Sequence, residues 1–142
     1  MMKKFFSAHG LWHDAGLGLI RILVGLMITY HGLEVFDSTK MKDYTDWMIK
    51  INLPAPAFMA YLGKGIEFFA GVLFSIGLFT RLMCIPLFFT MAFIPFVLGK
   101  GEVFTNDQHP FLFAIIFLIY FFTGAGKWSL DYALFDKRTR RQ

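Results

Sequence analysis

The chain has 142 residues, of which 56% are hydrophobic and 19 are phenylalanine; this exceeds the apolar share of ~45–50% that is usual for soluble domains. Its net charge of +4 arises mainly from a basic tail. There is no glycine-rich phosphate loop and no basic stripe with interleaved aromatic residues, so nucleic acid is excluded as a partner. Cys84 is the only cysteine, which excludes disulfide exchange within the chain and a cysteine-ligated iron–sulfur cluster.

Apolar blocks predict four membrane-spanning helices, at residues 15–36, 57–79, 82–98 and 110–125. The first two have the length of ~20 residues that a bilayer requires, and the last two borrow flanking residues. The connections at residues 80–81 and 99–109 are short, which makes consecutive helices antiparallel neighbours. The sequence therefore predicts one all-α domain over residues 1–142, a transmembrane four-helix bundle with antiparallel up-down topology. Its predicted surroundings are the lipid bilayer, which we count among its partners.

The long connection between the first two blocks has a pattern of its own over residues 38–51. Apolar side chains recur there at helical spacing, with charged residues between them: Met41, Tyr44, Met48 and Ile51. This pattern predicts an amphipathic helix on the membrane surface, and an ordinary solvated loop is the alternative. Pro54 and Pro56 then stop helix propagation before the second block.

Lysine and arginine are distributed unequally between the two ends of the predicted bundle. One end carries Lys3, Lys4, Arg81, Lys127, Lys137, Arg138, Arg140 and Arg141, and the other carries Lys40, Lys42, Lys50 and Lys100. Cytoplasmic loops hold the excess of such residues, so we expect both termini in the cytoplasm. We also expect the N-terminus to be retained, because Arg21 interrupts the first apolar block and no signal-peptide cleavage site follows it.

Ionisable side chains lie inside the first two predicted spans: Arg21, His31, Glu34, Lys64 and Glu67. A charged side chain near the bilayer centre raises the free energy of membrane insertion by ~2.5–3.5 kcal/mol. We therefore expect these residues to have a structural or functional role. They either pair with one another to hold the bundle together or line a functional site. We expect Arg21, which lies deepest, to form structural ion pairing inside the bundle, with Glu67 or backbone carbonyls as its partners.

The depths of the other ionisable groups place them together. With a rise of about 1.5 Å per residue, His31 and Lys64 lie at similar heights in the first two spans. Glu67 lies about one turn below them and Glu34 one turn above. His109 enters the fourth span from the same side. We therefore predict one polar cluster in the outer half of the bundle.

The chemistry of these side chains suggests their roles. His31 and Glu67 are the candidate catalytic residues, because an imidazole and a carboxyl group can transfer protons. The remaining members are candidate ligand-binding residues that can hydrogen-bond a carbonyl or hydroxyl group: Tyr30, Glu34, Lys64 and His109.

A metal is the less favoured alternative for this cluster. His31 and Glu34 are three residues apart on one helix face, as in carboxylate-bridged metal centres, and Glu67 and His109 complete a set of four. The usual duplicated motif is absent, so we assign no metal. A haem between His31 and His109 is disfavoured because both histidines lie near one surface. The cofactor is therefore left open.

A set of motifs, in order along the chain, resembles the DoxX family of small bacterial membrane proteins. The first half contains Arg21-x-x-x-Gly25, His31-Gly32 and Pro54-Ala-Pro56. Then follow Gly63-x-x-x-Glu67-x-x-x-Gly71, Gly77-Leu-Phe-Thr-Arg81 and, most specific of all, Gly124-Ala-Gly-Lys-Trp-Ser-Leu-Asp131. Many relatives carry a lysine soon after the His-Gly pair, where this chain has Leu33-Glu34-Val35-Phe36, so any role of that lysine does not transfer.

The resemblance implies a four-span helical protein in the bacterial cytoplasmic (inner) membrane. Relatives include a subunit of thiosulfate:quinone oxidoreductase and proteins linked to quinones or oxidative stress. We therefore expect a redox-associated membrane subunit, rather than a complete enzyme, that binds a quinone-like ligand in the outer-half polar cluster. Two alternatives stay open: a non-enzymatic scaffold or interaction protein with a structural charge network, and a small proton or solute carrier. Protein partners or a homo-oligomer are compatible with all three.

Overall fold

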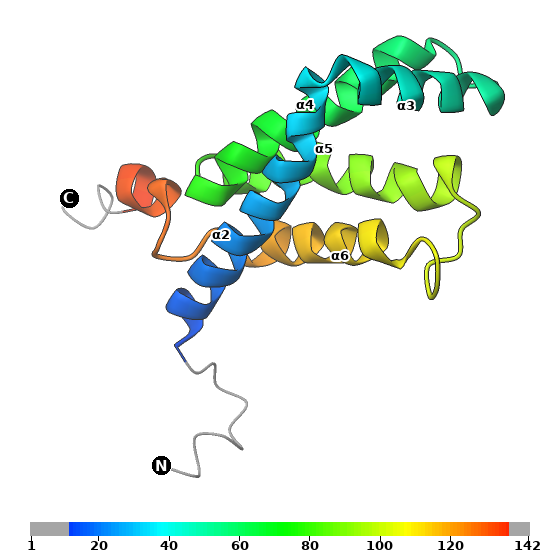
Figure 1. Ribbon diagram of the computed structural model, residues 1–142. Helices are drawn as coiled ribbons and strands as arrows, with labels where there is room; N and C mark the ends of the chain where they lie inside the picture. The colour runs from blue at the N-terminus through cyan, green and yellow to red at the C-terminus, as the bar shows by residue number, and fades with distance from the viewer. Residues whose placement is uncertain (1–11, 137–142) are drawn as a thin grey trace.

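The computed structural model describes residues 12–136, and over that range the chain consists of helices and their connections (Figure 1). The predicted retention of the N-terminus concerns residues outside the described range, as do the predictions for Lys3, Lys4 and the basic tail. The main helices are α2 (His13–Gly32), α3 (Ser38–Lys50), α4 (Pro56–Ile76), α5 (Thr80–Phe93) and α6 (Gln108–Thr123). Short turns of other helix types extend α2 as η1 (Leu33–Phe36), extend α5 as η2 (Ile94–Leu98) and end the described chain as η3 (Tyr132–Asp136).

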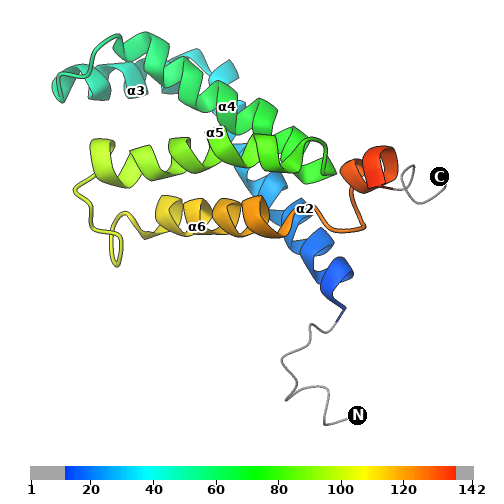
Figure 2. The same ribbon diagram turned by 180° about the vertical axis from the view of Figure 1, so that it is seen from behind.

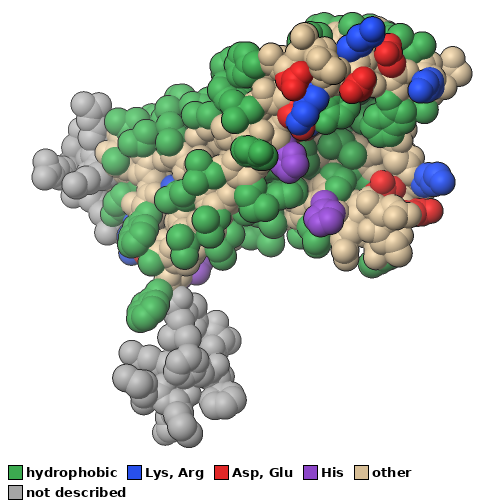
Figure 3. Space-filling view, in the orientation of Figure 1, with side chains coloured by type: hydrophobic (Ala, Val, Ile, Leu, Met, Phe, Trp, Pro, Cys, Tyr) green, Lys and Arg blue, Asp and Glu red, His purple; other side chains and the backbone are tan. Residues whose placement is uncertain are grey.

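Within residues 12–136, three helical segments are long and apolar enough to cross a membrane: His13–Phe36, Pro56–Ile76 and Thr80–Leu98. Helix α6 is apolar too, but its 16 residues reach only about 24 Å, less than a hydrocarbon core of ~30 Å. Hydrophobic side chains cover the middle of the face drawn in Figure 3, and charged side chains gather toward the end that carries α3. The predicted all-α membrane bundle is confirmed.

The helices pack in two pairs that cross each other. α5 and α6 lie side by side, whereas α2 crosses them obliquely and packs along α4 (Figure 1, Figure 2). α3 lies alongside the first half of α4, where Met41 and Met48 are buried against Ala60. Residues 38–51 thus form a helix with a buried apolar face rather than a loop, and the placement of this helix on the membrane surface stays a prediction.

Aromatic side chains fill the core between α4, α5 and α6. The ring of Phe74 meets those of Phe117 and Tyr120 edge-on, with centroids 5.1 and 5.2 Å apart. Such pairs contribute stability beyond the area they bury. The Tyr120 hydroxyl donates to the Leu17 carbonyl at 2.6 Å, so the same ring also ties α6 to α2.

Two glycines bring the backbones of α2 and α4 into contact. A Cβ at Gly25 would lie 2.6 Å from the Cα of Ser75, and a Cβ at Gly32 would collide with the backbone of Phe68. Gly18, Gly25 and Gly32 are seven residues apart, which predicts that they share one helix face. Gly25 and Gly32 of this series mark the α2–α4 contact. Gly18, the third member of the series, packs instead against Trp128, in the segment that follows α6.

Candidate functional site

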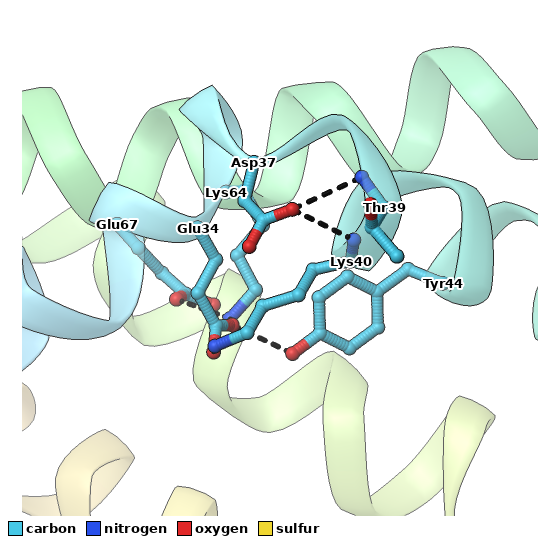
Figure 4. Close-up of polar contacts among 7 residues, drawn as sticks. All are labelled: Glu34, Asp37, Thr39, Lys40, Tyr44, Lys64 and Glu67. Carbon is cyan, nitrogen blue, oxygen red and sulfur yellow. Dashed lines mark hydrogen bonds and ion pairs between the residues drawn. The ribbon is translucent and has the colours of Figure 1, made fainter.

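A continuous network of ion pairs links η1, α3 and α4 (Figure 4). The Glu34 carboxylate pairs with Lys40 Nζ at 2.8 Å and with Lys64 Nζ at 3.0 Å. Lys64 Nζ also lies 2.9 Å from the Glu67 carboxylate, and the Tyr44 hydroxyl donates to Glu34 at 2.6 Å. One ammonium group is thus shared between two carboxylates inside the bundle.

The cap of α3 brings Lys40 and Tyr44 to Glu34. Asp37 begins the helix, and its carboxylate accepts from the backbone N–H groups of Thr39 and Lys40 at 3.0 and 3.2 Å. The chain turns there, so α3 lies beside α4 instead of continuing the direction of α2. Lys40 and Tyr44 are one helical turn apart and both face Glu34.

Burial increases along the network from α3 toward α4. The Lys40 side chain is 52% exposed, the Lys64 side chain 16% and the Glu67 side chain 4%. The Lys40–Glu34 pair contributes little to stability because water screens it, whereas breaking the buried Lys64–Glu67 pair would leave an uncompensated charge. Outside the spans, burial and the hydrogen bond to Glu34 raise the pKa of Tyr44, so its hydroxyl remains a donor at neutral pH. The hydrogen bond to Glu34 also raises the pKa of Lys40.

Two pockets flank the Lys64–Glu67 pair. The larger, of about 260 Å³, lies between α3, α4 and α5, with a mostly apolar wall that includes Trp47 and Phe93. The smaller, of about 130 Å³, is lined by His31 of α2 and His109 of α6. Lys64 and Glu67 line both pockets, so this pair is in contact with the pocket on each side of it.

Four of the six candidate catalytic and ligand-binding residues line one pocket: His31, Lys64, Glu67 and His109. Glu34 lines neither of the two pockets but holds Lys64 in the network. Tyr30 is 73% exposed and contacts His31 ring to ring, so the structure does not bring its phenol into the cluster. Sequence reasoning missed Tyr44 and Trp47 as site residues. Their only signal was the apolar face of the predicted 38–51 helix.

The alternative metal set His31, Glu34, Glu67 and His109 is not assembled. Within residues 12–136, no three histidine, cysteine or acidic side chains are grouped closely enough to hold a metal ion. The physical reason is Lys64, whose ammonium lies between the two carboxylates where a cation would have to bind.

Arg21 lies at the other end of the bundle and is 1% exposed. Its guanidinium donates to the carbonyls of Ala125 and Trp128, both at 2.6 Å, and to that of Ser75 at 3.4 Å. Of the two kinds of partner expected for Arg21, the structure provides backbone carbonyls and not Glu67. Ion pairing is therefore the wrong description of this residue, because no carboxylate in the described part of the chain pairs with it.

Three of the motif segments meet around Arg21. Gly77, in a left-handed conformation with φ +74°, leaves room for the guanidinium, since a Cβ there would lie 2.7 Å from its central carbon. The Asp131 carboxylate accepts from the N–H groups of Phe79 and Thr80 at 2.6 and 2.8 Å, which caps α5. The N–H of Asp131 in turn donates to the Gly77 carbonyl at 2.9 Å. These motifs therefore build one end of the bundle.

Comparisons with known proteins agree with these motifs. A family profile described as DoxX matches residues 16–100. An uncharacterized protein of Haemophilus influenzae is 30% identical over 85% of this chain and 92% of its own length. An uncharacterized membrane protein of Mycobacterium tuberculosis is 30% identical over 84% of this chain and 82% of its own. The Bacillus subtilis protein CatD, provisionally named an oxidoreductase, is 30% identical over 83% of this chain and 86% of its own. No solved structure matches the chain.

Proposed function

Because this chain belongs to the DoxX family of membrane proteins, we propose that it is a redox-associated membrane subunit that binds a quinone-like ligand between α3, α4 and α5. The observation that carries the proposal is the buried Lys64–Glu67 pair, which lines an apolar pocket on one side and a histidine-lined pocket on the other. The name given to CatD, an oxidoreductase, supports the same class of activity.

The size of the larger pocket limits what it can hold. Drug-sized ligands occupy pockets of ~300–1,000 Å³, and this pocket measures about 260 Å³. It therefore takes a single ring system, while an attached isoprenoid tail would stay in the lipid. Trp47 and Phe93 provide flat apolar surfaces for such a ring. Lys64 has three N–H groups, of which Glu34 and Glu67 take two, and the third can donate to a ring carbonyl.

The two flanking pockets suggest how protons move. Reduction of a quinone to a quinol consumes two electrons and two protons. The electrons come from a redox partner subunit, and the protons pass through Glu67 from the side of His31 and His109. In this scheme Lys64 binds and orients the carbonyl, and Glu34 holds Lys64 in place.

The test compares two isosteric variants of the same network. Glu67 lines both pockets and Glu34 lines neither, so Glu67→Gln should weaken binding of a short-chain quinone by about tenfold, while Glu34→Gln, which acts only through Lys64, should weaken it less. Binding is measured with purified protein as quenching of tryptophan fluorescence. Trp47→Phe should remove most of the quenching, because Trp47 lies in the pocket wall.

The scaffold alternative predicts a different outcome. The unbroken chain of pairs from Lys40 to Glu67 is also what a purely structural network would look like. In that case both glutamine variants would lower thermal stability and the wild-type protein would bind no quinone. Equal quinone affinity in wild type and Glu67→Gln would reject the proposed site.

We further propose that the protein lies in the bacterial inner membrane with both termini in the cytoplasm. The start of α2, the α4–α5 turn and the segment after α6 share one end, as the 2.7 Å Asp14–Lys127 ion pair and the Asp131 cap indicate. Arg81 and Lys127 lie at that end, which fits the excess of positive charge on the cytoplasmic side. Reporter fusions at Gln142 and within α3 should report opposite sides of the membrane. A periplasmic signal from the Gln142 fusion would invert the assignment.

A further inference from the structure

An open pocket of about 590 Å³ occupies the end of the bundle opposite the charge network. Its wall is formed by the α4–α5 turn, the start of α5, the segment after α6, and η3, which lies beside the turn in Figure 1 and Figure 2. The proposed quinone site does not use this pocket, so a ligand here is independent of the proposed function. Its wall includes Ala125, whose carbonyl accepts from Arg21.

Two polar groups in this wall have no partner within residues 12–136. Arg81 is exposed and makes no hydrogen bond or ion pair there; its guanidinium lies against Gly124, where a Cβ would come within 3.4 Å of Nη2. The Thr80 hydroxyl is buried, with the residue 1% exposed, and it has no hydrogen-bond partner. This oxygen has less than 1 Å² of accessible surface, so a ligand in the pocket cannot bond to it, and Arg81 is the group that a ligand can reach.

None of the three carboxylates around the pocket pairs with Arg81 in the described part of the chain. Asp131 accepts from the two N–H groups at the start of α5, and Asp14 pairs with Lys127. Asp136 is exposed and lines the pocket. The pocket therefore offers a guanidinium whose hydrogen-bond donors are open to a phosphate group.

A separate apolar groove lies along the seam between α5 and α6 and begins about one helical turn beyond Arg81. It measures about 160 Å³ and is lined by Cys84, Ile85, Phe88, Phe89, Phe117, Leu118 and Phe121. Arg81, Ile85 and Phe88 are spaced by four and three residues, so they share one face of α5. From Arg81 to Phe89 the helix rises about 12 Å, which keeps the groove within one leaflet of a ~30 Å hydrocarbon core.

We propose that this end of the bundle binds one anionic phospholipid, with its phosphate on Arg81 and an acyl chain in the α5–α6 groove. Arg81 shares one face of α5 with Ile85 and Phe88 of the groove, so one lipid molecule can contact both. A free phosphate ester would leave the groove empty. A zwitterionic lipid adds a cation next to Arg81, so the site favours a headgroup with net negative charge.

The experiment measures thermal unfolding of the full-length protein in detergent micelles with added ligand. Phosphatidylglycerol should raise the melting temperature, whereas phosphatidylcholine with the same chains and soluble glycerol phosphate should not. Arg81→Gln should remove the shift and weaken phosphatidylglycerol binding by about tenfold, as expected for one charge-assisted hydrogen-bonded contact. Lys100→Gln, which removes a charge from the opposite end, should keep the shift.

A second variant tests the groove separately from the phosphate contact. Ile85→Trp adds bulk to the groove wall and should reduce the phosphatidylglycerol shift while Arg81 stays in place. Circular dichroism at low temperature verifies that each variant is folded. The proposal is overturned if phosphatidylcholine or glycerol phosphate stabilises the wild-type protein as much as phosphatidylglycerol does, or if Arg81→Gln keeps the shift.

Discussion

Gly32→Ala should destabilise the protein by about 3 kcal/mol, near the upper end of the usual cost of overpacking. The added methyl group would collide with the backbone of Phe68, which cannot rotate away as a side chain can. The two helices would have to separate, and lipid supplies no hydrophobic force to hold them together. Thermal unfolding of the purified protein in detergent measures the effect.

The matched control for Gly32→Ala is Gly65→Ala. Gly65 lies in the partner helix α4, and a Cβ there would have no atom within 4 Å. This variant should be neutral or up to ~1 kcal/mol more stable, because alanine favours a helix over glycine. If Gly32→Ala melted at the same temperature as Gly65→Ala, the close approach of α2 and α4 would be wrong.

Arg21→Leu should cost about 3–5 kcal/mol and lower the amount of folded protein in the membrane. The variant would lose two short hydrogen bonds from a charged donor and leave the carbonyls of Ala125 and Trp128 without a donor in a buried place. Arg21→Lys should be intermediate, because a single ammonium cannot spread over three carbonyls as the planar guanidinium does.

Removal of a cation elsewhere provides the control for Arg21→Leu. Lys42 is exposed on α3, so Lys42→Leu should melt within about 1 °C of wild type, as surface substitutions usually do. Thermal unfolding and the abundance of a fluorescent fusion in membranes measure both variants. Wild-type melting of Arg21→Leu would show that these carbonyls do not need the guanidinium.

The class of the fold could be predicted from the amino-acid pattern alone. Blocks of about 20 apolar residues can adopt few structures in a membrane. The bilayer core holds no water, so a spanning segment must satisfy the hydrogen bonds of its backbone N–H and C=O groups within the protein. The spacing of Gly25 and Gly32 marked a contact face for a similar reason, since a helix repeats its faces every seven residues or so. The comparable depths of His31 and Lys64 followed from the fixed rise of the helix.

Which groups meet across the bundle depends on how the helices pack. Arg21 has its two shortest hydrogen bonds to carbonyls more than 100 residues away, and every residue has a backbone carbonyl, so no residue type in the sequence identifies these partners. Tyr44 and Trp47 reach the Lys64–Glu67 pair because α3 lies alongside α4, and that depends on the Asp37 cap and on where Met41 and Met48 are buried. Periodicity fixes a side chain's height and face on its own helix, but the rotation and crossing of helices are set by packing contacts distant in sequence.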